Sequence, residues 1–404
     1  ETKNWINIIV KKGESFTAPA AEGQLRPNGV SADAPLWWTD GSGNYYKPGD
    51  SVPADVSMIY PLWSGFGLLL DRGDGAVEVT PDNYTDIFGD GTASFILPRG
   101  ESYRTLEHGG FTLEEEQKIF STGKYGENIF PNLKLKNADL NTVTVNERYI
   151  GNESPLFITP SGKNTIGSLN GGGTVFSTLS ILGNGTLTLN SALTLWEYTQ
   201  YGGSCVTATD GLTATLIFMD GGSLTVTDEV QAVTMYDRLY GYYPGSGVRL
   251  FVGSSAQDAA EVFLPQLSPE MQALYERYLA GGSLTQEEYD TLYKATLKQW
   301  NDTLALFSGK TYVRITNAWD VTYQPGTDGT GNAVTDIKFY NDILTLRGKL
   351  FTRTGYTQTG WATTDGGEKT YGFEDVYTKN EALTLYPVWN ANSYTITVKP
   401  ENGD

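Results

Sequence analysis

Carboxylates are the side chains in this sequence whose type and spacing could do chemistry. The stretch "DRGDG" supplies Asp71 and Asp74, and "DIFGDGT" supplies Asp86 and Asp90. Two carboxylates about 5 to 10 Å apart can hydrolyse a glycosidic bond, and carboxylate oxygens are ligands that calcium prefers. An aspartate beside glycine more often accepts hydrogen bonds from its own turn. We therefore expect most of these aspartates to stabilise turns. The one metal hypothesis is calcium bound by Asp86 and Asp90, and no other cofactor is predicted.

Nucleophilic and metal-dependent chemistry finds little support in the other residues. His108 is the single histidine and Cys205 the single cysteine, which excludes a histidine metal cluster and an intrachain disulfide. The sequence has neither a G-x-S-x-G elbow nor a phosphate-binding glycine loop. Cys205 is expected to be a buried structural thiol. The sequence thus predicts a protein that is not an enzyme, and a polysaccharide lyase or hydrolase is the catalytic alternative.

Aromatic side chains make a better case for binding than the carboxylates make for catalysis. Trp196 lies in "LWEYTQYGG", and "MYDRLYGYY" follows at the matching place one repeat later. If these stretches stack, their rings and the neighbouring polar side chains would form a face for carbohydrate. The predicted glycan face comprises Trp196, Tyr198, Tyr201, Tyr236, Asp237, Arg238, Tyr240, Tyr242 and Tyr243. The alternative, which the pattern slightly favours, is that these rings pack against the fold itself.

The region that carries these residues, 65–316, repeats a short strand-turn-strand pattern. "LSILGNGTLTL" recurs as "LIFMDGGSLTV", with apolar positions 179, 181, 187 and 189 matching 216, 218, 224 and 226. Such repetition indicates stacked coils, each of which buries its apolar face against the next. We expect a mainly β fold with a central right-handed parallel β-helix-like domain, and a β-sandwich is the alternative. The glycine turns and leucines resemble those of β-helix carbohydrate-binding domains of gut-bacterial surface proteins.

A helical hairpin is predicted within this region, at residues 268–307. Ser268 before a proline is typical of a helix start, and Thr285 with Glu288 forms a capping box for a second helix. The strands "GVRLFVG" and "TYVRIT" on either side are expected to belong to one sheet. One stripe of the second helix is apolar and comprises Tyr289, Leu292, Tyr293, Thr296, Trp300 and Leu304. We expect the hairpin to bury this stripe and to cap the open end of the coils.

The segment 317–390 contains a distinctive motif. "FTRTGYTQTGWATTDGGEKTYGFEDVYTKNEALTLYPVW" combines glycines around a short strand, an Asp-Gly-Gly turn and an aromatic closing strand. From Trp319 to Trp389 the sequence resembles the internalin-type B repeat, also called the Listeria/Bacteroides repeat. The resemblance implies a small β-grasp-like module, of a kind found in arrays on bacterial surface proteins and without known chemistry of its own. Trp361, Tyr386 and Trp389 are expected to close its core.

Both ends of the chain repeat parts of this motif. "LWWTDGSGNYYKPGDSVPADVSMIYPLW" is a degenerate second copy, so residues 1–64 are expected to form a partial module without its first strand. Residues 391–404 include "NSYTITVKPENGD", which resembles that missing strand. Three explanations of these incomplete ends remain. We favour the first, that the boundary of the sequence falls within a repeat; the others are that the chain is one unit of a tandem array, or that its last strand is exchanged with a head-to-tail neighbour.

Composition limits the classes of partner and location. The chain has 404 residues, a formal net charge of −19 and no basic run, so neither nucleic acid nor an anionic membrane is an expected partner. No stretch approaches the ~20 apolar residues of a membrane span. We expect a non-enzymatic, extracellular segment of a longer bacterial cell-surface protein, an adhesin or stalk that displays the central domain. Binding of a glycan or host surface by that domain is the first alternative.

Overall fold

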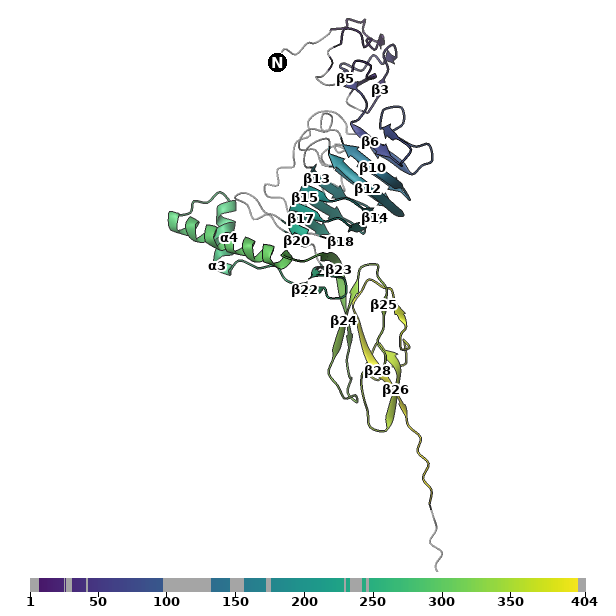
Figure 1. Ribbon diagram of the computed structural model, residues 1–404, viewed down its shortest axis with the longest axis vertical. Coiled ribbons are helices and arrows are strands. Elements are labelled where there is room, and N and C mark those ends of the chain that lie inside the picture. Colours follow the sequence, from purple (N-terminus) through teal and green to yellow (C-terminus); the bar gives the residue numbers. More distant parts are fainter. Residues whose placement is uncertain are drawn as a thin grey trace, which may run out of the picture. The chain divides into compact units, whose positions relative to one another are not determined.

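The computed structural model describes residues 7–24, 26, 31–40, 43–96, 132–145, 156–171, 176–228, 230–232, 242–244 and 247–398. The chain is mainly β and divides into two units, residues 1–315 and 316–404. We name three groups of strands by their residues: the N-terminal module (16–63), the central domain (66–315) and the C-terminal module (316–391) (Figure 1).

The central domain is built from two sheets whose strands alternate along the chain (Figure 1). Sheet 1 contains β10 (Asp139–Val145), β12 (Lys163–Gly171), β14 (Thr186–Leu189), β16 (Cys205–Ala208) and β18 (Ser223–Thr227). Sheet 2 contains β9 (Asn132–Lys136), β11 (Leu156–Ser161), β13 (Phe176–Ile181), β15 (Leu193–Tyr201), β17 (Leu212–Asp220), β19 (Val230–Ala232) and β20 (Tyr242–Pro244). Neighbouring strands in this set pair in parallel, whereas a β-sandwich requires antiparallel sheets. One strand from each sheet, with its turns, forms a unit that we call a coil.

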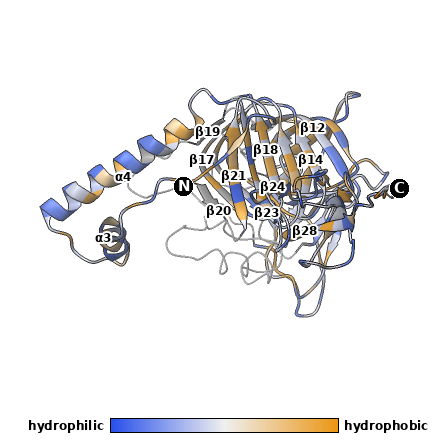
Figure 2. Ribbon diagram, turned by 90° about the horizontal axis from the view of Figure 1, so that it is seen from below, coloured by the Kyte–Doolittle hydropathy of each residue, from blue (hydrophilic) through white to orange (hydrophobic). Residues whose placement is uncertain are grey.

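Columns of buried apolar side chains run from coil to coil. In sheet 1, Leu189 pairs with Ile166 on one side and Ala208 on the other, and all three are buried. Sheet 2 has an equivalent column, formed by Leu156, Leu179, Tyr198 and Ile217. Side chains alternate between the two faces of a strand, so every second residue can join such a column. The apolar residues stand out on the strands in Figure 2.

The predicted repeat is in register in its second half and displaced by one residue in its first half. Ile181 lies in register with Met219, two strands away, and not with Phe218. The cause is a difference in turn length: residues 182–185 separate Ile181 from β14, but only 220–222 separate Met219 from β18. A one-residue shift exchanges the two faces of a strand. The inward residues of β17 are therefore Ile217 and Met219, both buried.

Other strands extend both sheets at their ends. β6 (Leu68–Asp71) pairs antiparallel with β10 and with β7 (Ala76–Glu78), and β8 (Ala93–Ile96) pairs antiparallel with β9. Beyond β18, sheet 1 continues through β23 (Tyr312–Tyr323) and β21 (Val248–Gly253) to β22 (Ala260–Val262).

The predicted helical hairpin is present as α3 (Pro269–Leu279) and α4 (Gln286–Phe307). Ser268 caps α3, and the capping box of Thr285 and Glu288 begins α4. The hairpin is inserted between β21 and β23, which are neighbours in sheet 1 as expected. Phe307, at the end of α4, packs in the core of the central domain, and the hydrophobic colour of α4 in Figure 2 is densest at that end.

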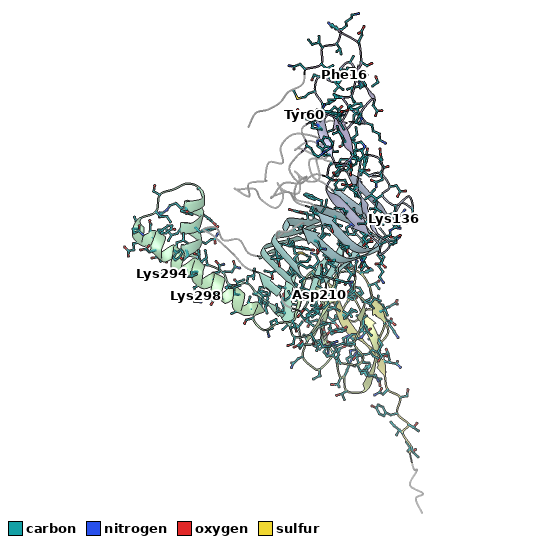
Figure 3. The ribbon with its side chains drawn as sticks, turned by 45° about the horizontal axis from the view of Figure 1, so that its top comes forward. Phe16, Tyr60, Lys136, Asp210, Lys294 and Lys298 are labelled. Carbon is teal, nitrogen blue, oxygen red and sulfur yellow. The ribbon has the colours of Figure 1, made fainter. Side chains whose placement is uncertain are left out.

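Burial of the predicted stripe on α4 is incomplete. Leu292 is buried, but Tyr289 and Tyr293 of the same stripe are exposed. Within the part of the chain that the structure describes, the hairpin contacts the coils through the C-terminal end of α4, where Phe307 packs in their core. Lys294 and Lys298, labelled in Figure 3, lie on the same helix and are also exposed.

The C-terminal module has a sheet with the order β24-β23-β28-β26. β23 pairs in parallel with β28 (Leu383–Ala391), while β24 (Val334–Phe339) and β26 (Tyr356–Ala362) pair antiparallel with their neighbours. β25 (Leu344–Thr345) pairs with β27 (Val376–Tyr377). The core consists of Val321, Tyr323, Leu346, Phe351, Trp361, Tyr377 and Leu385. Trp361 lies there as predicted, but Tyr386 and Trp389 are only partly buried because Tyr323 and Tyr377 fill the core.

The N-terminal module has counterparts of two strand pairs of the C-terminal module, β25–β27 and β26–β28. β1 (Phe16–Thr17) pairs with β4 (Ser51–Val52), and β2 (Leu36–Thr39) lies between β3 (Tyr45–Tyr46) and β5 (Tyr60–Trp63). Figure 3 labels Phe16 on β1 and Tyr60 on β5. Trp38 pairs with Pro61 as Trp361 pairs with Pro387. The strand pairing around these two tryptophans is therefore the same in both modules.

One hydrogen bond is the same in both modules. The Trp38 indole Nε1 donates to the Pro19 carbonyl at 2.8 Å, and the Trp361 indole Nε1 donates to the Arg347 carbonyl at 2.7 Å. In each case the acceptor lies two residues after the first short strand, β1 or β25. The tryptophan thus ties that strand to the closing sheet in both modules.

The columns of the central domain predict a clear difference between the two faces of β14. Leu187 is fully buried, so replacing it with alanine leaves a cavity and should lower the free energy of unfolding by about 2 to 5 kcal/mol. Thr186→Ala, on the exposed face of the same strand, should change it by about 0.5 kcal/mol or less. Urea denaturation followed by far-ultraviolet circular dichroism measures both. Equal losses for the two variants would contradict the assignment of faces.

Candidate functional site

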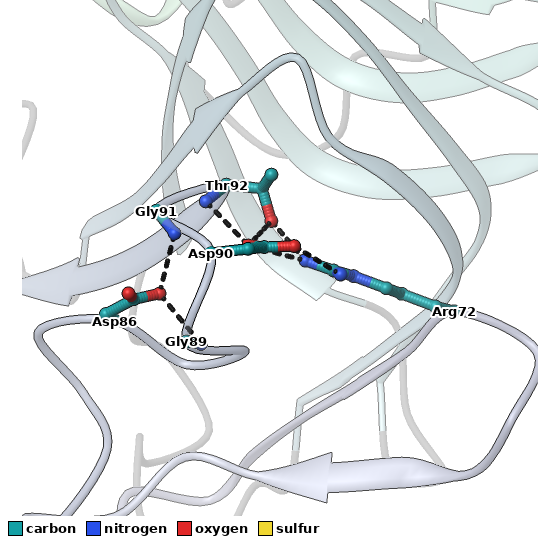
Figure 4. A network of polar contacts seen from close by, with 6 residues as sticks. All are labelled: Arg72, Asp86, Gly89, Asp90, Gly91 and Thr92. Atoms are coloured by element: carbon teal, nitrogen blue, oxygen red, sulfur yellow. Dashed lines mark hydrogen bonds and ion pairs between the residues drawn. The ribbon is translucent and has the colours of Figure 1, made fainter.

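The aspartates that the sequence offered for calcium lie in the loop before β8, beside the β6–β7 turn (Figure 4). Arg72 donates from its two terminal nitrogens to the two carboxylate oxygens of Asp90, at 2.7 and 3.1 Å. The guanidinium also contacts the Thr92 hydroxyl and lies over the Phe88 ring, 3.6 Å from its centre. Paired bonds of this kind fix both the position and the orientation of the carboxylate.

Asp90 is further held by Thr92, whose backbone N–H and hydroxyl donate to Oδ1 at 3.0 and 2.6 Å. The bond from Arg72, followed by those from Thr92, lowers the pKa of Asp90 well below its ordinary value. The same pairing raises the pKa of Arg72. Asp90 is therefore an anion whose charge is already balanced by a neighbouring cation.

Asp86 does different work in the same loop. Its Oδ1 accepts the backbone N–H groups of Gly89 at 3.0 Å and Gly91 at 2.9 Å. Both glycines have positive φ, so the carboxylate stabilises a loop conformation that glycine adopts easily. Asp71 accepts from Gly73 and Gly75 in the neighbouring turn in the same way. These contacts agree with the turn role expected of aspartates beside glycine.

Calcium at Asp86 and Asp90 stays a prediction, and these contacts do not favour it. A cation at Asp90 would have to displace the Arg72 guanidinium from both carboxylate oxygens. Within the described part of the chain, no group of three or more His, Cys, Asp or Glu residues is placed to hold a metal ion. Calcium in proteins takes about six to eight oxygen ligands, far more than this pair supplies.

The predicted glycan face is not assembled by the residues whose side chains the structure describes. Tyr198 is fully buried in the inward column of sheet 2, and its hydroxyl donates to Gln200 Oε1 at 2.7 Å. Burial raises the pKa of Tyr198 well above its ordinary value. Tyr201, at the end of β15, is also buried. Tyr198 and Tyr201 therefore pack within the fold, which was the alternative, and Tyr198 cannot contact a glycan.

The other members of that predicted face have no described side chain. Trp196 belongs to β15, and Tyr242 and Tyr243 pair through their backbones with Ile217 and Phe218. Four residues, Tyr236, Asp237, Arg238 and Tyr240, lie outside the described residues, as does His108. Their part in binding stays a prediction.

Cys205 differs from its predicted environment. It lies on β16, where it alternates with the buried residues Val206 and Ala208, and its own side chain is half-buried. The expectation of a fully buried thiol was wrong because the alternation of the strand places position 205 on the outer face.

Sequence reasoning missed two buried amides that join successive coils. Gln200 occupies an inward position between Ile181 and Met219, and its Nε2 donates to the carbonyl of Ser204 at 2.7 Å in its own coil and to that of Gly221 at 3.3 Å in the next coil. Asn164, also fully buried, accepts from Ala138 N and donates to the Thr186 carbonyl at 3.2 Å. The signal available in the sequence was a polar residue at a position where an apolar one is expected. Such a position can be recognised only when the register of the strands is known.

Exposed apolar side chains also lie on the helical hairpin. Tyr278 of α3 and Tyr289 of α4 meet edge to face at 6.3 Å, and Tyr293 and Leu297 continue along α4. Two lysines, Lys294 and Lys298, flank this surface on α4. No helix in the described part of the chain is long and apolar enough to cross a membrane.

Comparisons with protein families, curated proteins and solved structures find no match to this chain.

The Arg72–Asp90 pair predicts a pH-dependent contribution to stability. Because the pKa of Asp90 is lowered by folding, this contribution is present above the ordinary aspartate value and is lost as the pH falls toward the folded value. Asp90→Asn should therefore lower the thermal midpoint at pH 7, and the difference from the parent chain should shrink as the pH falls below about 4. Thermal unfolding from pH 7 to pH 2 measures it, with Asp33→Asn as an exposed control. A constant difference across this range would count against the pairing.

Asparagine variants of Asp86 and Asp90 test the calcium hypothesis. If Asp86 and Asp90 hold calcium, a millimolar excess should raise the unfolding temperature of the parent chain, and Asp86→Asn and Asp90→Asn should abolish the increase. If Arg72 already satisfies Asp90, calcium should leave the midpoint unchanged. Magnesium at the same concentration controls for ionic strength.

Proposed function

We propose that this chain is a non-enzymatic segment of a bacterial cell-surface protein, a stalk or adhesin in which a β-helix-like domain is displayed between small modules of the B-repeat type. The observation that carries the proposal is the repetition of one module at two places in the chain, with the same strand pairing and the same indole-to-carbonyl bond. Repeated small modules are a means of building length, since each folds around a core of its own. The sequence resemblance of residues 319–389 to the B repeat points the same way.

The central domain supports a structural role through the use of its polar groups. Gln200 and Asn164 bond to the backbone of neighbouring coils, at Gly221 and Thr186, and Asn184 accepts from Gly203 N at 3.0 Å. Asp86 and Asp90 stabilise their loop and pair with Arg72. Polar groups at a catalytic centre have to remain available to a substrate, whereas these are engaged within the fold.

Glycan binding and polysaccharide cleavage remain the alternatives from other functional classes. The burial of Tyr198 and Tyr201 removes two rings from the proposed sugar face, so no described contact favours glycan binding over the structural role. The stacked coils would suit an enzyme acting on a polysaccharide as well as they suit a display domain.

Surface display can be tested on the cells that produce the protein. Antibodies raised against the purified chain should label intact cells as strongly as permeabilised cells, and protease treatment of intact cells should remove the label. A cytoplasmic protein serves as the control that becomes accessible only after permeabilisation. Labelling that requires permeabilisation would overturn the proposed location.

Incubation with polysaccharides separates the structural role from the enzymatic alternative. The purified chain should release no reducing ends and no unsaturated products from pectin, alginate or mucin glycans over a day, with a commercial lyase as positive control. Release that disappears in a variant of the chain's own carboxylates would replace our proposal with the lyase or hydrolase.

A further inference from the structure

The chain enters the C-terminal module along β23 and leaves it along β28, and these two strands are direct neighbours. They run parallel, with residues 321–323 paired with residues 383–385. The Gln324 N–H donates to the Leu385 carbonyl at 2.8 Å and extends the pairing by one residue beyond β23. The first and last strands of the module's sheet are therefore joined to each other directly, and not only through the strands between them in the sequence.

Parallel pairing decides how tension along the chain acts on these two strands. Such tension pulls β23 from its N-terminal end and β28 from its C-terminal end. Because the strands run in the same direction, these are opposite ends of the pair, and the strands are pulled past each other along their length. The evenly spaced hydrogen bonds of a parallel pair then share the force and have to break together.

The neighbouring pair, β26 and β28, has the opposite geometry. These strands are antiparallel, and the Asn392 N–H donates to the Gly355 carbonyl at 2.9 Å where β26 begins and β28 ends. Force applied to these two adjacent ends would open the pair from that end, one bond after another. The module therefore contains one pair that tension along the chain loads in shear and one pair that can be peeled.

Buried side chains strengthen the pair that is loaded in shear. Val321, Tyr323 and Leu385 are fully buried, and the Tyr323 ring lies 4.8 Å from that of Trp361. The Tyr323 hydroxyl accepts the Arg347 N–H at 3.0 Å. Sliding β23 along β28 would move these side chains out of the core, and it would admit water that competes for the bonds between the strands.

The outer strands hold this pair from both sides. β24 pairs with residues 318–323 of β23, and β26 pairs with residues 386–391 of β28. Neither β23 nor β28 lies at an edge of the module's sheet, so each has to break bonds with two neighbours before it can leave.

We propose that the C-terminal module is a mechanical clamp, which resists tension along the chain through the parallel pair of β23 and β28. The resistance comes from the direction in which the pair is loaded, so it exceeds what the equilibrium stability of the module would give by itself. A segment that links two bodies under tension needs this property. The inference goes beyond the proposed function, and its test does not depend on where the protein is located.

Pulling the full chain in two directions tests the clamp. In a Cys205→Ser background, one handle is attached at Ser393→Cys. The second handle is attached at Asp320→Cys, which loads β23 and β28 in shear, or at Thr354→Cys, which peels β26 from β28; all three positions are exposed. The length gained in optical tweezers, about 3.3 to 3.6 Å for each residue released, identifies the event.

Shear should need at least about twice the force of peeling at the same pulling speed, because forced unfolding is governed by the unfolding rate and the sheared bonds have to break together. Both pairs of handles act on the same folded module, so its equilibrium stability is common to the two measurements. Equal forces, or a higher force in peeling, would overturn the proposal.

Two core variants separate the clamp from stability in general. Val321→Ala removes buried methyl groups on the loaded pair, whereas Leu346→Ala removes them from the same core beside β25. Leu346→Ala should lower the shear and peeling forces in similar proportion. Val321→Ala should lower the shear force more than the peeling force. If both variants lower the two forces in the same proportion, the module resists through its overall stability, and the clamp is wrong.

Discussion

The hydrogen-bonded ladder between one coil and the next is the interaction on which the central domain depends. Each strand of sheets 1 and 2 satisfies its backbone groups on the strands before and after it, and each apolar column continues across the same boundary. A single coil can pair its strands and extend its apolar columns only with the coils beside it, so its stability comes from its neighbours. Buried amides strengthen the same boundary, because Asn164 and Gln200 donate to the Thr186 and Gly221 carbonyls of adjacent coils, which an apolar side chain could not pair.

The same constraint explains where irregular structure occurs. The antiparallel strands β6 and β8 pair with β10 and β9 at one end of the two sheets, and β23, β21 and β22 continue sheet 1 beyond β18 at its other end. These elements give partners to strands that no further coil would pair. The Arg72–Asp90 pair belongs to this end region and fastens the β6–β7 turn to the loop before β8. Its charges therefore contribute to the integrity of the sheet end.

Local signals predicted much of this structure, and the errors arose where long-range register decides. The capping residues Ser268 and Thr285 placed both helices, because a cap needs only its own turn. The repeated motif predicted small modules at residues 1–64 and 317–390, and the strands around Trp38 and Trp361 pair in the same way there. Tyr198 was a candidate for the glycan face, with packing within the fold slightly favoured, and only its pairing with the buried Leu179 and Ile217 shows that it faces inward. The partnership of Arg72 with Asp90 joins two loops, and neither loop alone reveals it.

The indole-to-carbonyl bond of the two modules has a consequence for how such modules diverge. The acceptor is a main-chain oxygen, contributed by Pro19 in one copy and Arg347 in the other. Residues as different as proline and arginine can occupy that position because only the backbone takes part in the bond. A module stabilised in this way can exchange most of its side chains and keep its fold, provided that the tryptophan and the short turns remain. Distant copies would then share a pattern of hydrogen bonds long after their sequences had ceased to resemble one another.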